Sequence, residues 1–135
     1  MRAGGINWLA VVAAAIAIYA IGFVIYGLVV PPEWWMSAAG ITEEQVEAQG
    51  MARMPFSVVM PLMTAIFLAV LFKLGRVGDA STGVKWGVVV ALASAIPALL
   101  YGWVYGVGPF DLTLLDSGHL LLGHVAAGAI LGGWR

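Results

Sequence analysis

The chain has 135 residues, of which 62% are hydrophobic and only 10% are charged, and its mean hydropathy is +1.00. A soluble domain is typically ~45–50% apolar and ~25% charged, so this chain has too little polar surface to cover a water-facing core. The composition therefore indicates an integral membrane protein that forms a single domain, residues 1–135. The net charge of -1 argues against a nucleic-acid partner, and the absence of cysteine excludes disulfides and thiolate chemistry.

Four apolar runs are long enough to cross a bilayer as helices, which takes ~20 residues. The sequence predicts an all-α fold, an up-down bundle of four transmembrane helices at about residues 6–30, 55–74, 82–105 and 113–134. Pro31 and Pro32 end the first run, because proline cannot donate the hydrogen bond that the next turn needs. Pro61 and Pro97 lie inside the second and third runs and should bend them.

The only long polar segment, residues 33–54, separates the first two spans. Thr42 and Gln45 fit a capping box, in which the two side chains satisfy backbone N–H groups at a helix start. We expect a short amphipathic segment to follow in this outer loop and to stop near Gly50. Gly75 and Gly78 indicate a tight turn between the second and third spans.

Basic residues are distributed unequally between the two sides that a four-span topology creates. One side holds only Arg53, and the other holds Arg2, Lys73, Arg76, Lys85 and Arg135. Basic residues concentrate on the cytoplasmic side of membrane proteins. The sequence therefore predicts a multi-pass protein of the inner (plasma) membrane with both termini in the cytoplasm.

Small residues recur at helical spacing, which lets membrane helices approach closely. Gly83 and Gly87 lie on the third span, and Gly128 and Gly132 lie on the fourth. One interpretation is packing inside the bundle, and the other is that one stripe forms a homo-oligomer. Four short helices enclose little interior, so we expect a homo-oligomer in addition to the lipid bilayer as a partner.

The fourth span carries the ionisable groups, and we expect the other helices to be arranged around it. Asp116 and His119 lie one turn apart on one face, whereas His124 is about 140° round the helix from His119. Ionisable groups at membrane depth are costly, so they need partners or a use. The two histidines point too far apart to clamp one metal ion or haem, and the sequence predicts no metal site and no cofactor.

Each span also brings one hydrogen-bonding side chain close to its midpoint, namely Tyr19, Thr64, Ser94 and His124. In hydrocarbon such groups should turn inward and pair. They form either a structural network that fixes helix register or a midplane binding or proton-relay site. Tyr26 and Tyr101, at the outer ends of the first and third spans, complete the candidate ligand or proton site.

Two classes of function are consistent with these features. The first is a small transporter, channel or lipophilic-ligand binder, with a site for a small lipophilic or cationic ligand between the helices in the outer half. The alternative is a structural or accessory membrane subunit that assembles through its glycine stripes. An enzyme is the third class, because only Asp116, His119 and the tyrosines could carry proton chemistry and no catalytic motif occurs.

Short motifs at both ends of the chain carry a family resemblance. The first span opens with Ile6-Asn7-Trp8-Leu9-Ala10-Val11, and the fourth contains Gly118-His119-Leu120 and ends with Gly128-Ala129-Ile130-Leu131-Gly132-Gly133-Trp134. These motifs resemble a bacterial family of small membrane proteins catalogued as domain of unknown function 1761. The resemblance implies four membrane helices and no assigned activity. Its members often have Trp-Tyr where this chain has Ile25-Tyr26, and asparagine near Asp116.

Overall fold

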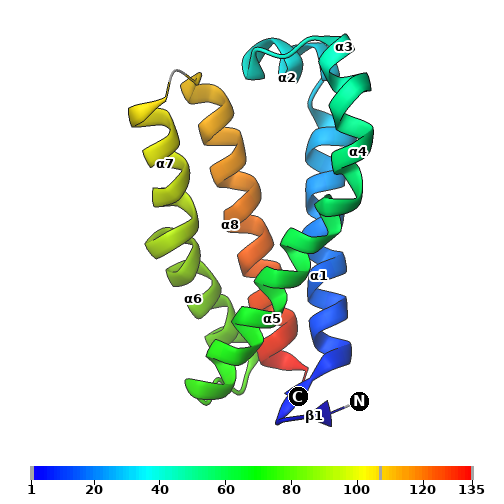
Figure 1. Ribbon diagram of the computed structural model, residues 1–135. Helices are drawn as coiled ribbons and strands as arrows, with labels where there is room; N and C mark the ends of the chain where they lie inside the picture. Colours follow the sequence, from blue (N-terminus) through cyan, green and yellow to red (C-terminus); the bar gives the residue numbers. More distant parts are fainter. Residues whose placement is uncertain (1, 107, 135) are drawn as a thin grey trace.

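The computed structural model describes residues 2–106 and 108–134 of the chain. Over these residues the regular secondary structure is helical apart from one short hairpin at the N-terminal end, and short connections join the helices (Figure 1). Four helical stretches are long and apolar enough to span a membrane, and they comprise Trp8–Val29, Met54–Leu74, Ala80–Tyr105 and Phe110–Gly133. The all-α fold class with four spans is thereby confirmed, with boundaries close to those that the hydropathy predicts.

The spans are built from regular helices joined by tighter or wider turns. The first consists of α1 (Trp8–Phe23) and the π-helical turn η1 (Val24–Val29). The polar loop between the first and second spans holds α2 (Pro32–Ala39), α3 (Glu43–Gln45), the π-helical η2 (Val46–Gly50) and α4 (Met51–Arg53). The second span consists of the 3-10 turn η3 (Met54–Val58) and α5 (Val59–Leu74). The third contains α6 (Ala80–Val90), the π-helical η4 (Ala91–Ala95) and α7 (Ile96–Tyr105), and the fourth is α8 (Phe110–Gly133).

Prolines mark the places where the spans lose regular geometry. Pro97 lacks the N–H that would bond back to the preceding turn, and the π-helical η4 directly precedes it. Pro61 lies in the first turn of α5, immediately after the 3-10 turn η3. Pro31 is the N-cap of α2 and Pro32 its first residue, so the first span ends where the sequence predicts.

The polar loop between the first and second spans differs from the prediction in one respect. The capping box is present, because Thr42 Oγ1 accepts from the Gln45 N–H at 3.3 Å and Gln45 Oε1 accepts from the Thr42 N–H at 2.9 Å. The helix does not stop near Gly50, however, and helical turns continue from Glu43 to Leu74 (Figure 1). Gly50 has φ -63° and ψ -48°, an ordinary helical conformation rather than the left-handed one that ends helices. The separate short helix of this loop is therefore α2.

α8 is the central helix of the bundle. It packs against α6 and α7 and also against α1 and α5, and Figure 1 shows it between these two groups. Both described ends of the chain lie at one end of the bundle with the turn between α5 and α6. The opposite end holds α2 and the connection from α7 to α8 (Figure 1). We call these the terminal end and the loop end.

The tightly packed core occupies the half of the bundle nearer the terminal end. Its buried side chains come mainly from α1, α5 and α8 and include Val11, Ala14, Ile18, Ala65, Leu68, Phe72 and Ala127. Among the described residues, none on η1, α2 or α7 is buried. The half nearer the loop end is therefore more open, and it is this half that leaves room for a site.

Four glycines allow the close approach of α6 and α8. A Cβ atom added at Gly83 would overlap the Gly128 carbonyl oxygen, and one added at Gly87 would overlap that of His124. In the reverse direction, a Cβ at Gly132 would lie 3.0 Å from the Gly83 Cα. Backbone atoms cannot move aside as a flexible side chain can. These glycine surfaces are thus occupied within the chain, which corresponds to the first of the two interpretations of the stripes.

Candidate functional site

α1 and α8 fit together by reciprocal packing of large side chains against glycines. A Cβ at Gly123 of α8 would lie 3.3 Å from Cγ2 of Ile18 on α1. One turn nearer the loop end the roles are exchanged, and a Cβ at Gly22 of α1 would lie 3.0 Å from Nε2 of His119 on α8. Gly22 therefore lets the His119 imidazole lie directly against the backbone of α1.

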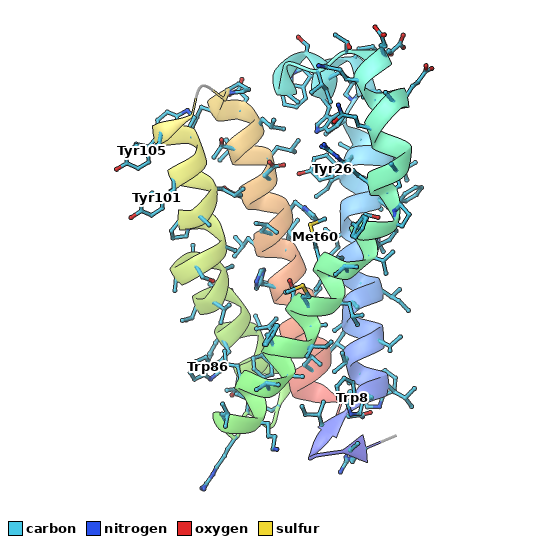
Figure 2. All side chains as sticks on the ribbon, viewed as in Figure 1. Trp8, Tyr26, Met60, Trp86, Tyr101 and Tyr105 are labelled. Atoms are coloured by element: carbon cyan, nitrogen blue, oxygen red, sulfur yellow. The ribbon has the colours of Figure 1, made fainter. Side chains whose placement is uncertain are left out.

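Tyr26 meets Asp116 and His119 just beyond this contact. The Tyr26 hydroxyl donates a short hydrogen bond to Asp116 Oδ1. Its ring lies edge-on to the His119 imidazole, with the ring centroids 5.4 Å apart and the planes at 85°. Figure 2 shows Tyr26 in the upper half of the bundle, between the ribbons of the first span and α8. We call Tyr26, Asp116 and His119 the outer cluster.

The outer cluster contains one polar atom without a partner. Nε2 of His119 is buried and accepts or donates no hydrogen bond among the described residues. The backbone of Ile18 lies near the ring, but no contact from it meets hydrogen-bond geometry at Nε2. An unsatisfied buried polar group costs about 1–3 kcal/mol. Such atoms are rare in folded proteins, and a bound water, an ion or a functional role can account for them.

A groove of about 450 Å³ opens beside the outer cluster, between η1, α2 and α8. Its walls are mostly apolar and are formed by Ile25, Leu114, Leu115, Leu122 and the Trp34 ring, with Gly118, Asp111 and His119 completing the lining. The volume lies within the ~300–1,000 Å³ of small-molecule sites, which combine apolar walls with a few convergent polar groups. We call it the outer groove.

Sequence reasoning identified only part of this site. It paired Asp116 with His119 from their spacing, and it named Tyr26 without assigning it to them. It missed Asp111 and Trp34 as groove residues. A signal for Asp111 is present, since residues 111, 115, 118 and 122 follow the helical spacing of one face of α8. No comparable signal indicates which part of the first outer loop covers that face.

His124 lies in the same helix as His119 but in a different environment. Its side chain is 7% exposed, and Nδ1 lies 2.7 Å from the carbonyl oxygen of Leu120 in the preceding turn. It lines a second groove, of about 490 Å³, together with Met63, Thr64, Phe67, Leu68, Leu71 and Val90. His124 is therefore a buried residue bonded to its own helix at the edge of an apolar groove.

Among the described residues, no hydrogen bond joins Tyr19, Thr64, Ser94 and His124 into the expected midplane network, although Thr64 and His124 line the same groove. Thr64 Oγ1 donates to the Met60 carbonyl at 3.1 Å and Ser94 Oγ to the Val90 carbonyl at 2.7 Å, each within its own helix. Tyr19 is 44% exposed on α1. Hydroxyl groups in membrane helices commonly bond to the carbonyl one turn earlier. Because the backbone already satisfies the hydroxyls of Thr64 and Ser94, equal depth does not make these groups pair.

Tyr101 also lies away from the outer cluster. Its side chain is 65% exposed on α7, and its ring stacks on that of Tyr105 with the centroids 5.8 Å apart. Figure 2 shows both rings on the side of α7 that faces away from α8. Residues 2–106 and 108–134 contain no group of three His, Cys, Asp or Glu side chains positioned to hold a metal ion.

The comparisons with known proteins bear on the family. A family model described as a protein of unknown function (DUF1761) matches residues 9–132, nearly the whole chain. No curated protein and no solved structure matches the chain significantly. The four spans, with the fourth at the centre of the bundle, thus belong to a membrane protein of the DUF1761 family.

Proposed function

We propose that the chain binds a small lipophilic cation in the outer groove, as a small transporter, channel or binding protein of the membrane. The observation that carries the proposal is the lining of this groove. The apolar walls from η1 and α8 are interrupted by one carboxylate, Asp111, and by the imidazole of His119. This arrangement suits an amphiphilic ligand that carries one positive charge.

The electrostatics favour a cation over an anion. Asp111 lines the groove directly, and Asp116 lies behind His119 with its Oδ1 accepting from Tyr26. The lining of the groove includes no lysine and no arginine among the described residues. Coulombic attraction is stronger near hydrocarbon than in water, so even one carboxylate selects the sign of a ligand there. The Trp34 ring adds a surface on which a cation is favourably placed.

We further propose that this site faces the outside of the bacterial inner membrane. The basis is the excess of basic residues at the terminal end, which holds Arg2, Lys73, Arg76 and Lys85. Cytoplasmic reporters should then be active when fused after Arg135, and periplasmic reporters within residues 43–49. The reverse pattern would place the outer groove on the cytoplasmic side.

The alternative function, a structural subunit that assembles through glycine stripes, has less support. Each of Gly83, Gly87, Gly128 and Gly132 already meets backbone atoms of the neighbouring helix in the same chain. We propose that a homo-oligomer of this protein uses other faces of the bundle.

Binding of a model lipophilic cation tests the proposal. Tetraphenylphosphonium would be titrated onto the protein in lipid nanodiscs, with empty nanodiscs correcting for partition into the bilayer. Asp111→Asn should weaken binding roughly fivefold, the effect of losing one partly solvated ion pair. Leu115→Trp should abolish binding, because the larger ring fills the groove.

The matched control is Glu43→Gln, which removes an acid at the same end of the bundle without touching the groove. It should bind tetraphenylphosphonium like the parent protein. Equal binding by Asp111→Asn, Leu115→Trp and Glu43→Gln would show that the cation does not occupy the outer groove.

A further inference from the structure

At the terminal end, the chain forms a second cavity that the proposed function does not use. It has a volume of about 370 Å³ and lies where the N-terminal hairpin, the end of α5 and the end of α8 meet. Its lining includes three basic residues, Arg2, Lys73 and Arg76, and no acidic one among the described residues. Asn7 and Trp134 contribute further polar and aromatic groups. We call it the basic cavity.

The hairpin that forms one wall is specified by its turn. β1 (Arg2–Ala3) pairs antiparallel with β2 (Ile6–Asn7), with Arg2 opposite Asn7. Gly4 and Gly5 link the strands with φ of +60° and +75°. A two-residue turn with both φ values positive requires residues such as glycine, and it returns the chain directly on itself. The turn thus carries Arg2 back to the mouth of the cavity.

Two hydrogen bonds from one side chain fix the hairpin to the bundle. Asn7 Oδ1 accepts from the Leu9 N–H at 3.2 Å and so caps α1, while Asn7 Nδ2 donates to the Trp134 carbonyl at 3.3 Å. A two-stranded hairpin is at best marginally stable alone. The bond to Trp134 joins the first and last described segments of the chain across the cavity, so the basic wall has a defined position.

The exposed side chain of Lys73 lies along this wall. A Cβ added at Gly5 would lie 3.3 Å from Cε and 3.9 Å from Nζ of Lys73. The Lys73 ammonium therefore lies against the hairpin turn, at the same cavity as Arg2. Arg76 lines the cavity too, but it has a further interaction, and the argument rests on Arg2 and Lys73.

We propose that the basic cavity binds a phosphate group, either the headgroup of an anionic phospholipid or a free phosphate ion. Arg2 and Lys73 supply two positive charges, and the Asn7 amide and the backbone of the glycine turn supply uncharged polar groups. Basic pockets between membrane helices are suited to acidic lipid headgroups because the charges meet at the depth of the headgroup layer. The Trp134 ring, which lines the same cavity, is a side chain typical of that layer.

Lipid binding to the purified full chain tests this inference. Native mass spectrometry would count bound phosphatidylglycerol and, in parallel, phosphatidylcholine, whose headgroup carries no net charge. We expect phosphatidylglycerol to bind in preference. Arg2→Gln and Lys73→Gln should each weaken its binding about fivefold, as expected for one basic residue near an anionic headgroup. Lys73→Arg keeps the positive charge and should bind phosphatidylglycerol like the parent protein.

The matched control is Lys85→Gln, which removes a basic residue near the terminal end that does not line the cavity. A second arm adds inorganic phosphate to the phosphatidylglycerol complex. Displacement at millimolar concentration identifies a site for phosphate ions, and retention of the lipid identifies a headgroup site. Equal binding of the two lipids, or equal weakening by Lys85→Gln and Lys73→Gln, would overturn the inference. None of these outcomes depends on the outer groove.

Discussion

Gly87→Ala should destabilise the bundle because it separates α6 from α8. The added Cβ would overlap the His124 carbonyl oxygen and lie 2.9 Å from its carbonyl carbon. Ordinary contacts begin near 3.4 Å, and the carbonyl oxygen lies nearer to the added Cβ than the carbon does, so α6 must move by about 1 Å. A gap of ~0.5–1 Å removes a quarter to a half of the attraction of each atom pair across a contact. Overpacking of this kind costs about 1–3 kcal/mol.

The matched control is Gly102→Ala in α7 of the same span, where nothing lies within 4 Å of the added Cβ. In both variants, replacing glycine by alanine inside a helix stabilises that helix by ~0.5–1 kcal/mol. The difference between them therefore isolates the contact, and we expect about 1–3 kcal/mol. Equilibrium unfolding in mixed micelles, followed by circular dichroism, measures it. Equal stability of the two variants would refute the assignment of the stripe to α6–α8 packing.

Three further predictions concern single hydrogen bonds. Tyr26→Phe keeps the ring against His119 but removes the hydrogen bond to the Asp116 carboxylate. The free energy of unfolding should therefore fall by about 1.5–3 kcal/mol in the same assay. An unchanged free energy of unfolding would mean that this hydrogen bond does not stabilise the fold. Nitrogen NMR of neutral His124 should find the proton on Nδ1, because that atom faces a carbonyl, and a proton on Nε2 would contradict this. The Thr82 backbone N–H donates to Asp79 Oδ1 at 2.8 Å, and this hydrogen bond lowers the pKa of the Asp79 carboxyl. The ionised carboxylate therefore stabilises the fold at a pH above the usual carboxyl pKa. This stabilisation is lost as the pH falls through the lowered pKa of Asp79. Asp79→Asn should consequently melt below the parent protein at neutral pH and together with it in strong acid, and a difference that persists in acid would exclude the charge as its source.

The positions of the four membrane spans along the chain were predicted correctly from the sequence. Hydropathy located four spans, and the first span ends at Pro31 and Pro32 as predicted. The spacing of Asp116 and His119 is a property of one helix, so their common face needed no tertiary information. The prediction that a helix ends near Gly50 was wrong. Glycine ends a helix only when the chain must turn, and the sequence at Gly50 does not require a turn.

Rotation of each helix about its axis was decided by tertiary packing. Tyr19 and Ser94 have the depth of His124 but are exposed on their helices, because backbone contacts of the glycines and Ile18 set the orientation of α6, α8 and α1. The same packing brought Tyr26 to Asp116 across 90 residues of sequence and aligned Gly22 with His119. Hydropathy measures the transfer of a segment into lipid, which is nearly the same for every rotation of an evenly apolar helix. Only the fit of one helix surface against another distinguishes those rotations, and that fit decides which polar groups meet.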